Sequence, residues 1–384
     1  MPFRVVIAPD KFKGCLGASA VAEAIGRGIG QQQPTWDIVL RPIADGGEGT
    51  VDAAVSAGFE RVSWLVRGPG GAPTTASFAR QGRVAVIEMA EASGLAKLPG
   101  GIRLPLDAST YGTGELLRAA VHGGCVDIIV GLGGSATTDG GSGLLSALGV
   151  RFLDDRGEEL RPGGGALREL ARIDAAGLDP AMAGVRIVVA SDVAVPLCGP
   201  TGAAVMFGPQ KGATPADVAV LEAGMMRLAE VMAHQVGADY AGRNGAGAAG
   251  GTGFALMAML GAQIRPGVDM VLDTVGFDAG VTGADLVITG EGAVDLQTLQ
   301  GKAPVGVLRR ARAQAPQASV VIVGGRIDIA RPQLLDAGFV AAFSLRERVR
   351  RPQESFDRAR ELLVEIGEEI ASLGLPTAHS RFRS

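Results

Sequence analysis

Short apolar runs alternate with glycine-rich breaks near both ends of this chain. The runs at residues 4–8, 37–43 and 286–289 have the length and β-branched content expected of buried strands, and those at 319–325 and 340–345 continue the series. Amphipathic patterns between them predict helices, the first of them capped by Ser19 and the last covering residues 352–372. Strands that alternate with helices indicate an α/β fold, a parallel sheet covered on both faces.

The middle of the chain has a different texture. Between residues 61 and 89, alternating segments joined by Gly/Pro turns predict antiparallel hairpins. Further strands at 126–130 and 185–190, with helices at 112–122, 215–235 and 247–260, complete this part. At 384 residues, the chain is too long for a single core. We therefore expect a discontinuous flavodoxin-like, doubly wound domain over 1–62 and 270–384, interrupted by a mixed α/β domain over 63–269.

The expected strand order carries a geometric prediction. In the flavodoxin-like order 2-1-3-4-5, the first strand and the strand at 286–289 are neighbours at the switch point, where ligands bind beyond the carboxyl ends of the strands. Asp10 and Lys13 follow the first of these strands, and Glu291 through Lys302 follow the second. The two segments should therefore line one crevice.

Composition excludes several classes of function. A net charge of −4 and 4% aromatic residues argue against nucleic acid as a partner. No window holds the roughly 18 apolar residues of a membrane span, and nothing at the N-terminus resembles a secretion signal. The three cysteines are widely spaced and form no CxxC pair, so neither a disulfide framework nor a zinc site is expected. These features predict a cytoplasmic protein.

Lysine is rare in this sequence. Of 36 basic residues, five are lysine, and four of these lie in the glycine- or proline-rich segments DKFKG, GPQKG and QGKAP. A lysine ammonium group acts as a compact point charge on phosphate. The placement therefore indicates phosphate binding.

The glycine-rich loop GLGGSATTDGGSG follows the strand at 126–130. Its start satisfies G-x-G-x-x-A, and with Asp154 as a ribose acid it matches a dinucleotide fingerprint. Asp139 and two glycines interrupt the region where the helix of that motif should run, which favours instead an anion nest with hydroxyls from Ser135, Thr137 and Thr138. Tight backbone packing is the alternative explanation for the glycines.

Several other catalytic motifs are absent. Gly301-Lys302 lacks the earlier glycine and the following Ser/Thr of a P-loop, and no G-x-S-x-G nucleophile occurs. What remains is a set of carboxylates at strand ends, interleaved with lysines and glycine loops. Phosphoryl transfer needs such a set, because acids hold Mg²⁺, cations and N–H groups bind phosphate, and one carboxylate accepts the hydroxyl proton.

Several motifs resemble the type 1 glycerate kinase family: APDKFKG, PIADGGEGT, GLGGSATTDGG, SDVAVPLCGPTGAA with FGPQKGA, and DLVITGEGAVDLQTLQGKAPVGV. The match runs from the first strand to the last helix. It implies phosphorylation of D-glycerate with ATP and Mg²⁺ by a discontinuous flavodoxin-like domain and an inserted second domain. Two departures, Cys15 for serine and Thr138 for asparagine, affect fine substrate contacts rather than the reaction.

We assign roles to the candidate residues as follows, in a cleft between the two domains. Asp192 is the general base at the acceptor hydroxyl, and Lys13 and Lys302 neutralise phosphate and carboxylate charge. The remaining assignments are Mg²⁺ ligands Asp45, Glu48, Glu291 and Asp295; substrate or phosphate contacts Asp10, Ser135, Thr137, Thr138, Lys211, Gln297 and Thr298; and nucleotide-binding glycines Gly133, Gly134, Gly290 and Gly292.

Two alternatives from other classes stay open. An NAD-dependent dehydrogenase of a small hydroxy acid would use Asp154 at a ribose. A non-catalytic sugar-acid-binding protein would bind glycerate without transfer, although the strand-end acids argue against it. The resemblance favours 2-phosphoglycerate as product, and a homodimer is one expectation for an oligomeric state that the sequence does not fix.

Overall fold

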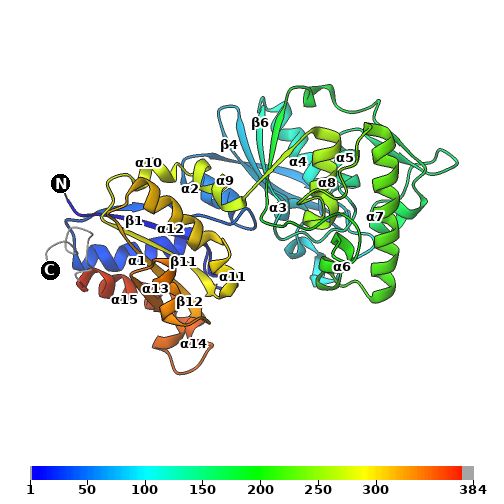
Figure 1. The fold of residues 1–384 in the computed structure, drawn as a ribbon. Helices are drawn as coiled ribbons and strands as arrows, with labels where there is room; N and C mark the ends of the chain where they lie inside the picture. Colours follow the sequence, from blue (N-terminus) through cyan, green and yellow to red (C-terminus); the bar gives the residue numbers. More distant parts are fainter. Residues whose placement is uncertain (1, 374–384) are drawn as a thin grey trace. The chain divides into compact units, whose positions relative to one another are not determined.

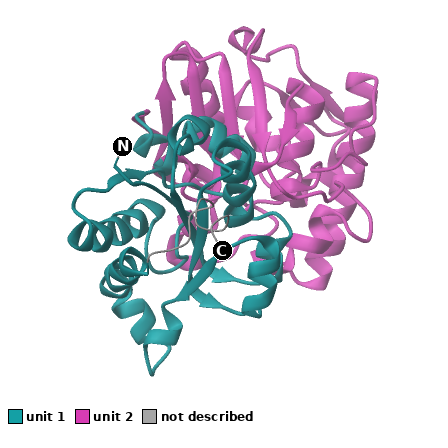
Figure 2. Cartoon of the chain, turned by 60° about the vertical axis from the view of Figure 1, so that its left-hand side comes forward, with its two compact units in different colours: residues 1–45, 52–58, 268–384 teal, residues 46–51, 59–267 magenta. Residues whose placement is uncertain are grey.

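The computed structural model describes residues 2–373, which fall into two compact units. Unit 1 comprises Met1–Asp45, Asp52–Gly58 and Val268–Ser384, and unit 2 comprises Gly46–Val51 and Phe59–Gly267 (Figure 2). The sequence-based domain boundaries, at residues 62/63 and 269/270, stay a prediction.

Unit 1 is built on a five-stranded parallel sheet (Figure 1). Its strand order, β2-β1-β11-β12-β13, is the predicted order 2-1-3-4-5, and the α/β doubly wound fold class is confirmed. The strands are β1 (Arg4–Pro9), β2 (Asp37–Leu40), β11 (Leu286–Val294), β12 (Ser319–Ile327) and β13 (Ala341–Ser344).

Strand side chains in unit 1 alternate between two apolar cores, as the period of two requires. Val5 and Ile7 of β1 face a core shared with helices α1 and α15, whereas Val6 and Ala8 face a core shared with α12. Helices therefore cover both faces of the sheet. The helices with residues in this unit are α1 (Ala18–Gln32), α2 (Thr50–Ser56), α9 (Gly267–Thr274), α10 (Phe277–Val281), α11 (Leu296–Leu299), α12 (Ala303–Gln314), α13 (Arg331–Ala337), α14 (Glu354–Asp357) and α15 (Ala359–Ser372).

Unit 2 contains a six-stranded mixed sheet in the order β10-β9-β6-β5-β4-β3 and a two-stranded ribbon of β7 and β8. The predicted hairpins are confirmed, since β3 pairs antiparallel with β4, and β4 with β5. The strands are β3 (Glu60–Arg67), β4 (Pro73–Gln81), β5 (Val84–Glu88), β6 (Asp127–Gly131), β7 (Arg151–Leu153), β8 (Arg172–Asp174), β9 (Arg186–Ala190) and β10 (Gln263–Arg265). The helices are α3 (Met89–Ser93), α4 (Tyr111–His122), α5 (Ser142–Ala147), α6 (Ala203–Phe207), α7 (Pro215–Val236) and α8 (Ala248–Leu260).

Two local predictions were wrong, and a third is confirmed with a local difference. Helix α1 begins at Ala18 with Gly17 as its N-cap, because the Ser19 hydroxyl lies 2.9 Å from that of Ser56 and makes a tertiary contact. The closing helix is broken into α14 and α15. The expected helix over 247–260 is confirmed as α8, although its backbone turns to the left-handed region, with positive φ angles, from Ala249 to Gly251.

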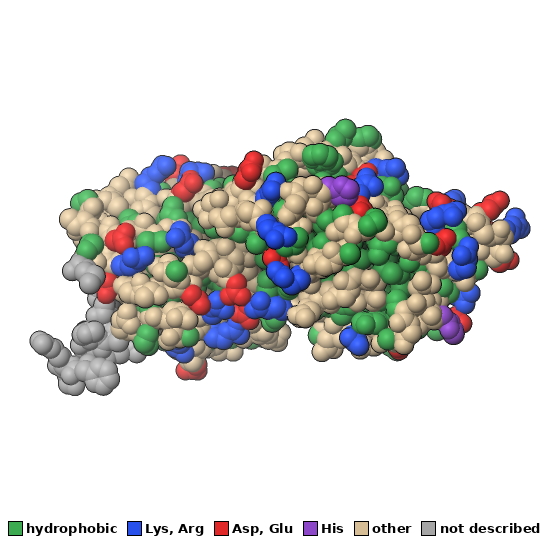
Figure 3. Space-filling view, turned by 90° about the horizontal axis from the view of Figure 1, so that it is seen from above, with side chains coloured by type: hydrophobic (Ala, Val, Ile, Leu, Met, Phe, Trp, Pro, Cys, Tyr) green, Lys and Arg blue, Asp and Glu red, His purple; other side chains and the backbone are tan. Residues whose placement is uncertain are grey.

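Arginine carries most of the positive charge, as the sequence indicated. Figure 3 shows basic and acidic side chains interspersed over one face of the chain. Arg310, for example, pairs with Asp273 and, at 2.8 Å, with Asp278. No helix within residues 2–373 is long and apolar enough to cross a membrane.

Helices α1 and α15 pack through two glycines. A Cβ on Gly28 would lie 2.0 Å from the Val364 carbonyl oxygen, and one on Gly367 would lie 2.3 Å from that of Ile25. A methyl group at either position therefore forces the helix backbones apart. The close contact fixes the helical layer on one face of the unit 1 sheet.

We expect Gly28→Ala to lower the stability of unit 1. Overpacking of this kind costs about 1–3 kcal/mol. The matched control is Gly30→Ala on the same helix, where the nearest atom to the new Cβ would be 3.7 Å away. This variant should be more stable by roughly 0.5–1 kcal/mol, because alanine loses less backbone freedom on folding than glycine does. Urea denaturation checks both, and equal midpoints for the two variants would contradict the packing argument.

Candidate functional site

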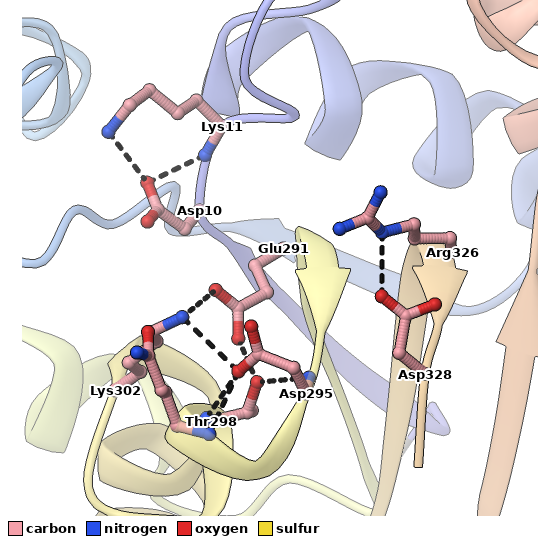
Figure 4. Close-up of polar contacts among 9 residues, drawn as sticks. Asp10, Lys11, Glu291, Asp295, Thr298, Lys302, Arg326 and Asp328 are labelled. Carbon is pink, nitrogen blue, oxygen red and sulfur yellow. Dashed lines mark hydrogen bonds and ion pairs between the residues drawn. The ribbon is translucent and has the colours of Figure 1, made fainter.

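A cavity of about 800 Å³ opens in unit 1 at the carboxyl ends of β1, β11, β12 and β13. Figure 4 shows polar contacts among some of the residues that line it. Asp10, Lys11 and Lys13 line it from the loop after β1, and Glu291 and Lys302 line it from β11 and the start of α12. The predicted meeting of these two segments is confirmed. Its cause is the parallel pairing of β1 with β11, which places Pro9 opposite Gly290.

Asp10 is a buried carboxylate at the floor of this cavity. Its N–H donates to the Gly290 carbonyl (2.8 Å), and its carboxylate accepts from the Lys11 N–H (2.7 Å) and lies 3.8 Å from Lys11 Nζ. Burial raises the pKa of Asp10 to about 7; the Lys11 charge opposes this, and the neighbouring charges of Asp45 and Glu291 add to it. The group therefore changes its charge near neutral pH.

A hydrogen-bonded network joins the segment after β11. Asp295 caps α11 by accepting from the N–H groups of Gln297 (2.8 Å) and Thr298 (3.1 Å). The Thr298 hydroxyl donates to Glu291 (2.6 Å) and accepts from the Asp295 N–H (2.9 Å). Thr298 is fully buried. Through these hydrogen bonds it holds both Glu291 and Asp295 in place.

Lys302 lies between the two acids. Its Nζ is 3.4 Å from Asp295 Oδ1 and 4.0 Å from Glu291 Oε2. Burial raises the pKa of Glu291, although Thr298 and Lys302 act against it. Burial is also the largest influence on Asp295 and raises its pKa, but the hydrogen bonds from Thr298 and Gln297 and the Lys302 charge outweigh it, so its pKa is lowered.

The two glycines of β11 fill different roles in space. A Cβ on Gly290 would lie 1.9 Å from the Val323 carbonyl oxygen, so only glycine fits beside β12. Gly292 lines the cavity, and a Cβ on it would lie 3.0 Å from the backbone nitrogen of Lys13. Close packing accounts for Gly290, and the nucleotide-binding role of both stays a prediction.

Three of the five lysines line this cavity: Lys11, Lys13 and Lys302. Lys11 was expected only to share in the phosphate binding of the loop lysines, and no role was predicted for the charged residues at the ends of β12 and β13. No motif distinguishes these from ordinary charged turns, although a rare lysine beside Asp10 was a usable signal. The unassigned charged lining residues are Lys11, Arg326, Asp328, Arg346 and Glu347.

The acids of this cavity could hold Mg²⁺ that is bound to a nucleotide, although they do not form a complete metal site by themselves. Within residues 2–373, no group of three or more His, Cys, Asp or Glu side chains is arranged to hold a metal ion. Mg²⁺ bound to a nucleotide, however, is usually held by one or two carboxylates together with phosphate oxygens. Asp45 and Glu291 are close enough to Asp10 to raise its pKa. A cation shared by these three carboxylates would therefore relieve their repulsion. Asp295 is held by its own helix cap, and Glu48 belongs to unit 2.

A second group of predicted residues gathers at one edge of the unit 2 sheet. Glu88 ends β5, Gly131 ends β6 and Ala190 ends β9; these strands are parallel neighbours, with Gly131 opposite both other residues. The glycine loop and Asp192 therefore leave the sheet side by side. The Asp192 side chain is exposed, and its Oδ1 accepts from the Gly267 N–H (3.0 Å).

The segment Gly46–Val51 packs against this same edge. A Cβ on Gly133 would lie 2.4 Å from the Gly47 Cα, which explains the glycine by tight packing, the alternative weighed above. Glu88 is buried, and its carboxylate accepts from the N–H groups of Gly49 (3.0 Å) and Val51 (3.3 Å). Exposed Glu48 thus lies in a segment that Glu88 holds in place. The cofactor role of Gly133 and Gly134 stays a prediction.

Lys211 is buried against the glycine loop. Its Nζ donates to the Thr137 carbonyl (2.5 Å) and the Ser135 hydroxyl (3.2 Å). Burial lowers the pKa of Lys211 to about 8, and the Asp139 charge opposes this. The hydroxyl of Thr138 is also buried and has no hydrogen-bond partner in the described chain. Two of the three predicted hydroxyl residues of this loop, Ser135 and Thr137, therefore contact Lys211.

Asp139 holds the loop from the other side, whereas its place in the sequence indicated only an interruption of the helix expected there. Its carboxylate is fully buried and accepts from the N–H and hydroxyl of Thr110 (2.8 Å each), Gly141 (3.1 Å) and Gly143 (3.2 Å). Burial raises the pKa of Asp139, and these hydrogen bonds lower it. It is a positioning residue for the glycine loop and a counter-charge for Lys211.

The geometry does not match a dinucleotide fingerprint. The glycine loop continues to Gly141 before α5 begins, whereas that motif opens directly into a helix. Asp154 accepts from the N–H groups of Arg156 and Glu158 (2.9 Å each) and closes a local turn.

Comparisons with known proteins agree on one family. The model of the glycerate kinase family matches residues 5–374. The chain is 44% identical over 372 residues to a glycerate kinase of Bacillus subtilis (strain 168), covering 96% of this chain and 97% of the relative. It is 41% identical over 373 residues to the glycerate 2-kinase of Escherichia coli (strain K12), with 96% and 97% coverage. A solved structure from Salmonella typhimurium LT2, named for a glycerate kinase 2, has a TM-score of 0.85 at 40% identity and covers 97% of this chain and 98% of that one. The chain belongs to the glycerate kinase family.

Proposed function

We propose that this protein transfers a phosphoryl group from ATP to D-glycerate. The observation that carries the proposal is the unit 1 cavity, where three of five lysines converge with Asp10, Asp45 and Glu291 at a sheet switch point. Its volume of about 800 Å³ lies within the usual range of small-molecule sites. Product as 2-phosphoglycerate is favoured by the name of the Escherichia coli relative.

The cations of the unit 1 cavity suit the phosphate groups. Lys11, Lys13 and Lys302 offer ammonium groups that bind phosphate oxygens and offset the charge that builds up during transfer. Asp10, Asp45 and Glu291 would hold the Mg²⁺ that travels with ATP, with Glu48 and Asp295 as further candidates from the sequence. The chemistry supplied by Mg²⁺ held there would be to offset the negative charge of the phosphate groups.

We assign the binding of D-glycerate, the phosphoryl acceptor, to the edge of the unit 2 sheet where β5, β6 and β9 end. Asp192 is the proposed general base, because it is exposed and follows β9 next to the glycine loop. Buried Lys211 gives this loop a positive charge that suits the glycerate carboxylate. An interdomain cleft, a cytoplasmic location and a homodimer stay predictions from the sequence.

The test of the proposed function is ³¹P NMR of the protein with MgATP and D-glycerate. We expect a new phosphomonoester resonance, whose proton coupling separates the 2-phosphate from the 3-phosphate. Transfer to another hydroxy acid in place of D-glycerate would correct the substrate. ATP left intact with every acceptor would contradict the proposal and favour the sugar-acid-binding alternative.

Asp192→Asn should reduce kcat by a factor of about 10²–10⁴, the usual contribution of a general base. The amide keeps an oxygen to accept from the Gly267 N–H, so folding should change little. Asp154→Asn, which alters a local turn, is the matched control and should retain activity. Steady-state kinetics check both variants, and near-normal turnover by Asp192→Asn would remove it from the role of base.

Asp10→Asn should lose activity and yet gain stability above neutral pH. The native pKa of Asp10 is about 7, above its ordinary 3.8, so the folded state keeps a proton that the unfolded state has lost. Wild-type stability should therefore fall between about pH 4 and 7, and the difference between these pKa values corresponds to at most roughly 4 kcal/mol. The asparagine variant lacks this fall.

Urea denaturation at pH 5 and pH 8 tests the Asp10 prediction. Asp336→Asn, at an exposed site on α13, is the control and should show the same pH response as wild type. A wild-type excess of stability over Asp10→Asn at pH 8 would show that Asp10 is not held as a strained carboxylate.

A further inference from the structure

A second cavity, of about 450 Å³, lies wholly within unit 2. None of the residues assigned to catalysis or to ATP and glycerate binding lines it. Its volume falls within the range of small-molecule pockets. Its lining comes from β3, the start of α4, α5, β7 and the segment from Glu159 to Leu167.

Three arginines give this cavity a positive charge. The Arg67 guanidinium is held 4.0 Å above the Tyr111 ring, and the Arg151 Nε lies 2.7 Å from Glu159 Oε1. Arg161 makes no ion pair within residues 2–373. Glu159 is the one acid of the lining, against three arginines, and Asp174, outside the lining, lies 4.0 Å from Arg151.

Serine hydroxyls and an apolar wall complete the lining. Ser142 is 8% exposed, and its hydroxyl makes no hydrogen bond with the described residues although it lines the cavity. This hydroxyl is reachable from the cavity and can therefore donate to a ligand there. Ser146 adds a second hydroxyl, and Val150 and Phe152 supply apolar surface.

We propose that this cavity is a binding site for a small organic anion that carries a phosphate and a carboxylate on a short carbon skeleton. Arg151 and Arg161 lie on neighbouring segments of the chain. They suit the phosphate, because one guanidinium group can donate two parallel hydrogen bonds to two phosphate oxygens. Arg67 comes from β3, and Tyr111 orients its guanidinium group. We assign Arg67 to the carboxylate of the ligand. The site stands independently of the proposed kinase activity.

The cavity and the glycine loop share one buried carboxylate. Ser109 and Tyr111 of the cavity wall flank Thr110, and Thr110 donates two hydrogen bonds to Asp139. Gly143, also in the wall, donates a third. A ligand that moves this wall therefore changes the loop that holds Ser135 and Lys211. By linkage, the site is coupled to whatever binds that loop.

Calorimetric titration with 3-phosphoglycerate at low ionic strength tests the site. We expect a binding event in the wild type that weakens at least tenfold in the double variant Arg151→Gln/Arg161→Gln. The matched control is Arg156→Gln/Arg168→Gln, which removes two exposed arginines of the same unit outside the cavity and should bind as wild type does. Equal affinity in both double variants, or no binding by the wild type, would overturn the proposal.

Kinetics test the coupling separately. Adding 3-phosphoglycerate should shift the KM for D-glycerate more in the wild type than in Arg151→Gln/Arg161→Gln, because any competition at the catalytic site is common to both. Equal shifts would overturn the coupling. Since the calorimetric test needs no turnover, its result does not depend on the proposed activity.

Discussion

The parallel pairing of β1 with β11 is the contact on which unit 1 depends. It joins segments 281 positions apart, as the hydrogen bond from the Thr289 hydroxyl to the Ala8 carbonyl shows. Loops after both strands then leave at one edge, and the cavity forms where they do. Packing gives this pairing little tolerance, because Gly290 has no room for a side chain beside β12. The sheet and the site are therefore fixed by the same few residues.

Buried charge is the second constraint on this molecule. Asp10, Glu291 and Asp139 are taken out of water, and burial raises the pKa of each. Each is offset differently: Asp10 by one adjacent lysine, Glu291 by Thr298 and Lys302, and Asp139 by four hydrogen bonds. The least compensated carboxylate, Asp10, lines the larger of the two cavities together with Glu291. Such a concentration of perturbed groups marks functional sites in general.

Glycine serves packing as well as ligand access in this fold. The 59 glycines suggested loops that approach a ligand, and Gly292 does line the unit 1 cavity. Gly28 and Gly133 instead let backbones approach each other, in a helix pair and in a loop contact. Both uses leave the same short apolar-and-glycine pattern in the sequence. The pattern alone therefore cannot separate them.

The sequence by itself determined the strands of unit 1, the hairpins of unit 2 and the carboxylates at strand ends, because hydrophobic period and glycine breaks are local signals. The strand order of unit 1 followed from the sequence only on the assumption of a flavodoxin-like fold, and the structure agrees with it. The sequence also singled out the rare lysines, and its motifs placed the chain in its family. The tertiary structure decided the rest. Burial of Lys211, the loop-holding part of Asp139 and the grouping of Arg67, Arg151 and Arg161 depend on strand register and packing between distant segments. No local pattern carries that information, since an arginine in a surface turn and one beside a cavity look alike in sequence.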